Sequence, residues 1–120
     1  IQDSSILILG ISYKPDVKDI QLTPAEQVIN KLQDLGVKIY IYDPYFKSKK
    51  VFGITVAENI ENVISTVDAS IILTAHDEFK KIEIALFSKM LNPILIDTRG
   101  IIDPLLAKNE KLIFRGLGRG

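Results

Sequence analysis

Short apolar runs alternate with amphipathic segments along the whole chain. Residues 6–9 (Ile-Leu-Ile-Leu) are apolar without interruption, which is typical of a strand in a parallel sheet covered on both faces. Residues 24–35 then place apolar side chains at helical spacing, which predicts an amphipathic helix that stops before Gly36. Alternation over residues 37–42 predicts a second strand.

The same pattern predicts the elements that follow. Strands are expected at residues 69–73, 94–96 and 111–114, with a short extended piece at 54–56 after a loop over 45–53. Helices are expected at residues 59–65, 84–91 and 103–108, the last capped by Asp103 with Pro104 at its first position, with a helical turn at 78–81. Strands that alternate with helices predict an α/β fold. The expected architecture is a Rossmann-like three-layer sandwich, with helices on both faces of a mostly parallel sheet of about five to six strands. The 120 residues are predicted to form one domain (1–120).

An unusually long loop joins the first strand to the first helix. About a dozen residues stand where strand-to-helix connections usually take roughly two to six. The loop contains Tyr13, Lys14 and Pro15, and it ends at a predicted capping box with Thr23 as N-cap and Glu26 three residues later. Because helix N-termini attract anions, we expect this loop to bind a ligand with a flat ring and negative charge.

Ligands of parallel α/β sheets bind outside the carboxyl ends of the strands, near the point where the strand order reverses. Here the expected ends are 11–14, 43–45, 74–77 and 97–99. Lys14 and Arg99 are the cations of this rim, and together they could neutralise a diphosphate. The simpler interpretations are a solvated loop lysine and an arginine paired with Asp97 or Asp103.

Other polar residues near the rim favour structural roles. His76 is the single histidine, and beside Asp77 it is more typical of a capping or hydrogen-bonding residue than of a catalyst. Asp43-Pro44 is interpreted as a turn, with a ligand contact as the less favoured alternative. The lysines within residues 47–50 are interpreted as a solvated face.

Several α/β nucleotide sites are excluded by their missing residues. A dinucleotide fingerprint needs three glycines at the first turn, and only Gly10 is present. Tyr13 and Lys14 would block the backbone approach to a pyrophosphate, so this sheet is not expected to bind NAD in the usual way. The chain also lacks the acidic pair of a phospho-receiver and the Gly-Lys-Ser/Thr of a phosphate-binding loop.

Composition narrows the partners further. Fifteen basic and fifteen acidic side chains cancel, which argues against a nucleic-acid surface. The absence of cysteine removes disulfides, thiolate metal sites and thiol nucleophiles from this chain. No apolar run approaches the roughly 20 residues that span a bilayer, so no membrane partner and a cytoplasmic location are expected. The chain starts without methionine, and we expect it to be a piece of a longer protein.

Taken together, the motifs at the strand ends resemble a known family. The chain is similar to the C-terminal domain of the UDP-glucose/GDP-mannose dehydrogenases, most of all to the branch that oxidises UDP-N-acetylmannosamine. The motifs that carry the resemblance are Gly10–Asp16, Asp19, Thr23-Pro24, Asp43-Pro44, Thr74–Phe79 and Asp97–Arg99.

The resemblance implies an enzyme made of three parts. An N-terminal domain would bind NAD, a central helical segment would form a homodimer, and this domain would bind the nucleotide of a UDP-sugar. Two NAD-dependent oxidations would convert the sugar's primary alcohol to a carboxylate for polysaccharide precursor synthesis. The reaction would pass through a thioester on a cysteine outside this chain, so this chain alone is not expected to be catalytic.

The resemblance also implies roles for single residues. Tyr13 and Lys14 match the aromatic-lysine pair that contacts the UDP-sugar, and Arg99 falls in the Asp-x-Arg segment of the substrate pocket. Many relatives make the contact from the next position, which is Gly100 here. Gln21 takes the place of an arginine that reaches NAD, and glutamine cannot neutralise a pyrophosphate. The alternative is a stand-alone nucleotide-binding or assembly module without catalytic activity.

Overall fold

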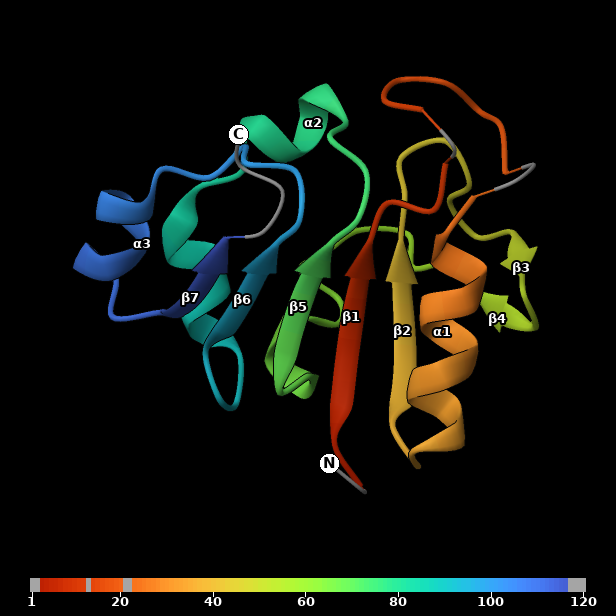
Figure 1. Cartoon of the computed structure of the whole chain (residues 1–120), viewed down its shortest axis with the longest axis horizontal. Coiled ribbons are helices and arrows are strands. Elements are labelled where there is room, and N and C mark those ends of the chain that lie inside the picture. Colours follow the sequence, from red (N-terminus) through yellow and green to blue (C-terminus); the bar gives the residue numbers. More distant parts are fainter. Residues whose placement is uncertain (1–2, 13, 21–22, 117–120) are drawn as a thin grey trace.

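A five-stranded sheet forms the centre of the molecule, with strand order β2-β1-β5-β6-β7 and every neighbouring pair parallel (Figure 1). The structure is a computed structural model that describes residues 3–12, 14–20 and 23–116. The strands are β1 (Ser5–Leu9), β2 (Lys38–Tyr42), β5 (Ala69–Ile72), β6 (Ile94–Asp97) and β7 (Ile113–Gly116). The sheet confirms the predicted Rossmann-like architecture.

Each face of the sheet buries its own core. Ile8 of β1 packs with Ile29 of α1 (Ala25–Asp34) on one face. Leu7 of the same strand packs on the other face with Phe79 of α2 (Asp77–Lys80) and Phe87. Successive strand residues point to opposite faces, so burial on both sides requires an apolar residue at every position. This explains why residues 6–9 of β1 are all apolar.

Two predicted helices are 3-10 helices instead. The segment 59–65 is helical only in its last two residues, where η1 (Ile64–Thr66) begins, and 84–91 contains η2 (Ile84–Lys89). In the first segment the Asn59 side-chain oxygen accepts from the Asn62 N–H at 2.8 Å, as at a helix N-terminus, but only the last residues of the segment are helical, in 3-10 geometry. Short 3-10 pieces are common as connectors, and here they return the chain to the sheet over few residues.

The predicted loop over 45–53 contains a strand of a second, two-stranded sheet. β3 (Lys50–Val51) and β4 (Ile54–Thr55) pair antiparallel. Their two-residue turn has positive φ at both positions, +52° at Phe52 and +80° at Gly53, as type I′ hairpin turns require. An aromatic residue is rare in that conformation, so the sequence pattern did not predict the hairpin.

The helices α1 and α3 begin at or within one residue of their predicted positions. α1 starts at Ala25, one residue later than predicted, and the Thr23 hydroxyl accepts from the Ala25 N–H at 3.3 Å rather than from Glu26. α3 (Pro104–Asn109) starts as predicted, with the Asp103 carboxylate accepting from the Leu105 N–H at 2.9 Å. None of the helices in the described ranges is long and apolar enough to cross a membrane.

The strand order reverses between β1 and β5. The chain leaves β1 for β2 on one side, then returns past β1 to build β5, β6 and β7 on the other. All five strands point the same way, so the loops after them meet at one edge, the upper edge in Figure 1. Folds of this type bind ligands at such a reversal, which places the candidate site between the loops after β1 and β5.

Candidate functional site

A buried carboxylate joins the ends of β1, β2 and β5. Asp43, directly after β2, is fully buried, and its Oδ2 accepts from the Ile11 N–H at 2.9 Å and the Ser12 hydroxyl at 3.1 Å. The same oxygen lies 2.9 Å from Nε2 of His76, beyond β5. The other oxygen accepts from the Tyr45 N–H at 2.9 Å, which confirms the predicted turn. Asp43 therefore links three strand ends that are distant in sequence.

These hydrogen bonds favour the ionised form of Asp43. Burial alone raises the pKa of this carboxyl, but hydrogen bonds from His76 and from the backbone N–H groups of Ile11 and Tyr45 outweigh it and hold the pKa below its usual value. Asp43 is a charged acceptor surrounded by donors. It can order the surrounding backbone, and its oxygens are already occupied by protein groups.

His76 is a buried hydrogen-bonding residue, as the sequence predicted. Its side chain is 0% exposed. Nδ1 accepts from the Asp16 N–H at 2.8 Å, so the proton is assigned to Nε2, which donates to Asp43. The rings of Tyr45 and Phe79 lie 5.1 Å and 5.4 Å from the imidazole, between centroids. The imidazole is enclosed by protein, and its contacts indicate a structural role.

The loops after β1 and β5 approach each other closely at Gly10 and Thr74. The Thr74 hydroxyl donates to the Ser12 carbonyl at 3.0 Å. Gly10 has φ +92°, and a Cβ built there would lie 2.5 Å from the Thr74 Cβ. A side chain at position 10 would therefore collide with Thr74, and glycine lets the two loops approach this closely.

Arg99 reaches from the loop after β6 to the end of β5. Its Nε donates to the Leu73 carbonyl at 2.9 Å. Asp97 instead accepts from the backbone N–H groups of Arg99, Gly100 and Ile102, at 2.9, 2.9 and 2.8 Å. Among the described residues the Arg99 guanidinium forms no ion pair with Asp97 or Asp103, so the predicted salt bridge was wrong.

Lys14 lies exposed in the loop after β1, on the predicted rim. This loop is hydrogen-bonded to Thr74, and the Arg99 side chain is hydrogen-bonded to Leu73. The two predicted cations thus come from loops that are both hydrogen-bonded to residues 73–74, although β5 lies between β1 and β6, the strands that these loops follow. Tyr13 and Gln21, the other predicted site residues, lie outside the residues that the structure describes.

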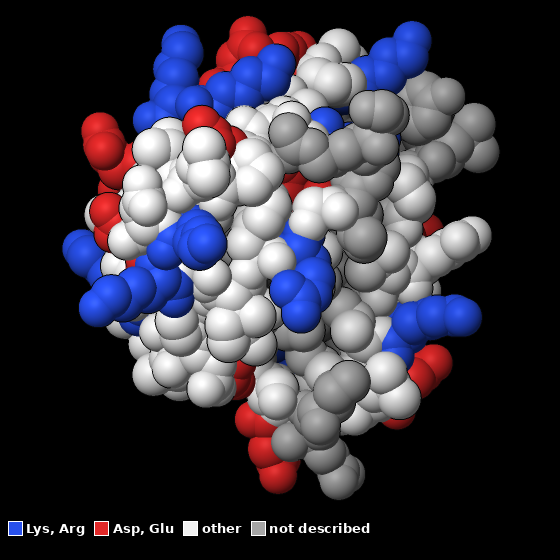
Figure 2. Space-filling view, turned by 60° about the vertical axis from the view of Figure 1, so that its left-hand side comes forward, with Lys and Arg blue, Asp and Glu red and all other residues white. Residues whose placement is uncertain are grey.

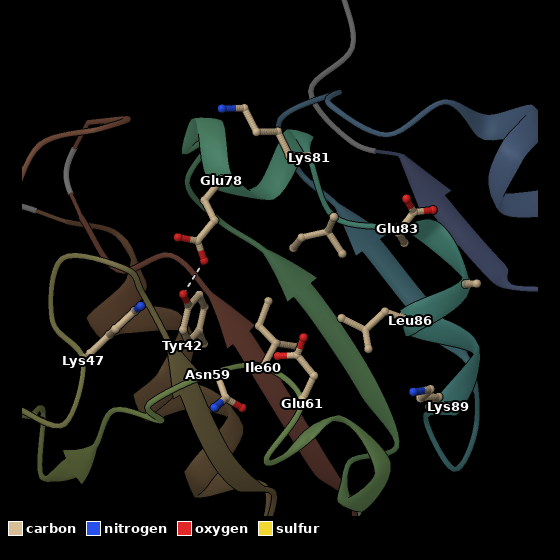
Figure 3. A pocket seen from close by; sticks show the side chains of 12 residues that line it. Tyr42, Lys47, Asn59, Ile60, Glu61, Glu78, Lys81, Glu83, Leu86 and Lys89 are labelled. Atoms are coloured by element: carbon tan, nitrogen blue, oxygen red, sulfur yellow. Dashed lines mark hydrogen bonds between the residues drawn. The ribbon is translucent and has the colours of Figure 1, made fainter.

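A cavity of about 650 Å³ lies away from these cations, between β2, the 59–61 turn, α2 and η2 (Figure 3). Its apolar wall includes Ile60 and Leu86, and the Tyr42 hydroxyl donates to the Glu78 carboxylate at its edge. Burial and Glu78 raise the pKa of Tyr42. Neither Lys14 nor Arg99 lines it. No single sequence motif pointed to this cavity, because its walls come from separate segments.

Charge elsewhere is mixed. On the face shown in Figure 2, Lys and Arg side chains are scattered among acidic and uncharged ones, and the described residues there form no continuous basic surface. No cluster of three or more His, Cys, Asp or Glu residues with the geometry of a metal site occurs in the described ranges.

A family model and individual relatives all match this chain to the same protein family. Residues 7–104 match the model of the UDP-glucose/GDP-mannose dehydrogenase family, UDP binding domain. The chain is 31% identical over 119 residues to the UDP-N-acetyl-D-mannosamine dehydrogenase of Methanocaldococcus jannaschii, which covers 96% of this chain and 27% of that protein. It is 33% identical over 105 residues to the UDP-glucose 6-dehydrogenase of Rhizobium meliloti, which covers 84% of this chain and 24% of that protein.

Solved structures agree with this result. The UDP-D-ManNAc dehydrogenase of Pyrococcus horikoshii superposes with a TM-score of 0.81 at 31% identity, over 98% of this chain and 26% of that one. The NDP-N-acetyl-D-galactosaminuronic acid dehydrogenase of Methanosarcina mazei gives a TM-score of 0.86 at 24% identity, over 98% and 25%, which bears on the fold alone. The chain spans about a quarter of the length of these relatives.

Proposed function

This chain belongs to the UDP-glucose/GDP-mannose dehydrogenase family, as its UDP binding domain, and we propose that it holds the UDP part of a UDP-sugar inside a longer NAD-dependent dehydrogenase. That protein would oxidise the primary alcohol of the sugar to a carboxylate, as a cytoplasmic homodimer in polysaccharide precursor synthesis. The two relatives described above are named as dehydrogenases of UDP-N-acetyl-D-mannosamine and of UDP-glucose, which supports a UDP-sugar as substrate.

The arrangement of the two cationic loops around Leu73 and Thr74 carries this proposal. Arg99 donates to the Leu73 carbonyl, and Thr74 donates to the loop that contains Lys14. Both loops flank the end of β5, next to the point where the strand order reverses, and ligands of this fold class bind there. A diphosphate at this edge would lie within the reach of two long cationic side chains.

Each cation would have a separate task. The Arg99 guanidinium uses its Nε for Leu73, which leaves its two terminal nitrogens to donate to a pair of phosphate oxygens. Lys14 would supply a compact positive charge to the same diphosphate. Tyr13 would contact the nucleotide, a role that rests on the family resemblance alone.

NAD and the chemical step belong to other parts of the longer protein in this proposal. The turn at Gly10 lacks two of the three glycines of a dinucleotide fingerprint, and the chain contains no cysteine that could carry a thioester. An N-terminal NAD-binding domain and a central domain would supply both. Gln21 would face the cofactor across the domain interface, where it could donate a hydrogen bond but no charge.

Substrate kinetics of the complete natural protein test the assignment of Lys14 and Arg99. Lys14→Ala and Arg99→Ala should each raise the KM for the UDP-sugar about 10- to 100-fold, because a charged hydrogen bond contributes roughly 1.5–3 kcal/mol. The KM for NAD should change little. Lys108→Ala, an exposed lysine on α3, is the matched control and should leave both constants unchanged.

Two outcomes would contradict the proposal. Unchanged KM values in both rim variants would remove Lys14 and Arg99 from the site. Tight UDP binding by the 120-residue chain, with no dehydrogenase activity in the complete protein, would favour the stand-alone binding module. Calorimetry with UDP, the UDP-sugar and NAD separates these cases.

A further inference from the structure

The loop that carries Lys14 is anchored before that residue by Asp43. The backbone N–H of Ile11 and the hydroxyl of Ser12 both donate to Oδ2 of this carboxylate, at 2.9 Å and 3.1 Å. Asp43 is fully buried and Ser12 nearly so. The first anchor therefore lies two residues before Lys14 in the sequence and is shielded from water.

A second anchor lies two residues after Lys14. Asp16 has φ +58°, a left-handed conformation that turns its N–H toward Nδ1 of His76 at 2.8 Å. Its carboxylate accepts from the Asp77 N–H, also at 2.8 Å. Lys14 thus lies on a short span between two fixed points, and the Asp43–His76 contact joins these points to each other.

The second anchor needs a neutral imidazole with its proton on Nε2. His76 must donate to Asp43 from Nε2 and accept from Asp16 at Nδ1, on two different edges of one rigid ring. Asparagine and glutamine hold their donor and acceptor on the same terminal group, so they cannot bridge the two partners in this way. Tyr45 and Phe79 pack around the ring and hold its orientation.

We propose that His76 is a positioning residue of the nucleotide-sugar site. It clamps the loop after β1 by joining Asp16, within the loop, to Asp43, and so fixes Lys14 where it can contact the diphosphate. This inference rests on the proposed function, which gives Lys14 its ligand. His76 is buried beneath the loop and acts through the backbone, without touching the substrate.

Nuclear magnetic resonance on the unmodified 120-residue chain tests the clamp directly. His76 is the only histidine, so long-range proton–nitrogen correlations report its tautomer without ambiguity. We expect the proton on Nε2, together with hydrogen exchange at the Asp16 amide about tenfold or more slower than at the exposed Val17 amide. A proton on Nδ1, directed at the Asp16 carboxylate 3.8 Å away, would overturn the proposal, as would rapid exchange at Asp16.

UDP-sugar binding by the complete natural protein tests the link to Lys14. His76→Gln keeps a donor near Asp43 and removes the acceptor for Asp16, whereas His76→Asn keeps an acceptor near Asp16. We expect the Kd to rise about tenfold in His76→Gln and less in His76→Asn. In a Lys14→Ala background, His76→Gln should cause no further loss, because both variants remove the same contact.

The alternatives give different results. An equal loss from His76→Gln with and without Lys14 would indicate a purely structural role and would overturn the proposal. If His76→Gln fails to fold, the tautomer and the Asp16 exchange rate of the unmodified chain still decide whether the clamp exists. If the unmodified protein does not bind UDP-sugar, the proposed function fails, while those two measurements continue to judge the clamp.

Discussion

Asp43 and Asp97 are two fully buried carboxylates at strand ends, yet their hydrogen-bond partners lie at different distances along the sequence. Asp97, the last residue of β6, accepts from the backbone N–H groups of the residues that follow it by two, three and five positions. Asp43, just after β2, accepts from groups 31 to 33 positions away, at the ends of β1 and β5. One carboxylate shapes its own turn, and the other joins three turns.

The difference separates the rim into two regions. Around Asp43, the ends of β1, β2 and β5 form one connected hydrogen-bond network, so a change in any member should be felt by the others. Around Asp97, the hydrogen bonds of the carboxylate remain inside one loop. We therefore expect the Lys14 loop to depend on a carboxylate far from it in sequence. The turn around Arg99 depends on the nearby Asp97 carboxylate, and the side chain of Arg99 also depends on the Leu73 carbonyl.

Removal of the two carboxylates should show the largest contrast. Asp43→Ala leaves four buried or half-buried donors without their acceptor, and we expect it to lower the free energy of unfolding by about 3–5 kcal/mol. Asp97→Ala frees three backbone N–H groups of one loop, two of them half-buried, and removes no partner from β1 or β5, so about 1–3 kcal/mol is expected. Urea denaturation measures both. Equal losses would contradict the division of the rim into two regions.

Gly10→Ala should strain the contact between the loops after β1 and β5. Gly10 has φ +92°, and the added Cβ would lie 2.5 Å from that of Thr74. Left-handed backbone and overpacking together are expected to cost about 2–5 kcal/mol. Gly53→Ala is the matched control, because it has φ +80° with no atom within 4 Å of its Cβ, so about 1–2 kcal/mol is expected. Thermal unfolding of both variants compares them, and equal losses would exclude the steric contact.

Acid should weaken the network around Asp43 by a smaller amount. The pKa of Asp43 is lower in the folded protein than in the unfolded chain, so its contribution to stability is present above about pH 4 and is lost as the pH falls through the folded pKa. Asp43→Asn should be less stable at neutral pH and show a flatter acid limb. An unchanged acid limb in denaturation midpoints from pH 7 to 3 would refute this.

Local features were predicted well from the sequence. The apolar run of β1, the helix α1 and the Asp103 cap of α3 depend on neighbouring residues, and the structure confirms each of them. The turn at Asp43 and the hydrogen-bonding role of His76 were also predicted correctly. Parallel strands brought the predicted rim residues to one edge, because that follows from topology alone.

Features that depend on distant partners could not be predicted. The sequence gives no sign that Asp43 contacts the loop after β1, or that Arg99 donates to a carbonyl beyond β5. The 3-10 geometry of the segments 59–65 and 84–91 follows from how they rejoin the sheet, which amphipathic spacing does not reveal. The roles of Lys14 and Arg99 toward a ligand stay predictions.

Phe52 holds a backbone conformation that Asn and Gly adopt far more readily, with φ +52° in the turn of the β3–β4 hairpin. Its ring nevertheless packs at the margin of the core beneath α1. A designer who installed Phe52→Asn would obtain the preferred Asn-Gly turn and lose the ring that fastens the hairpin to the domain. The hairpin would then form more easily in isolation and detach more easily from the sheet.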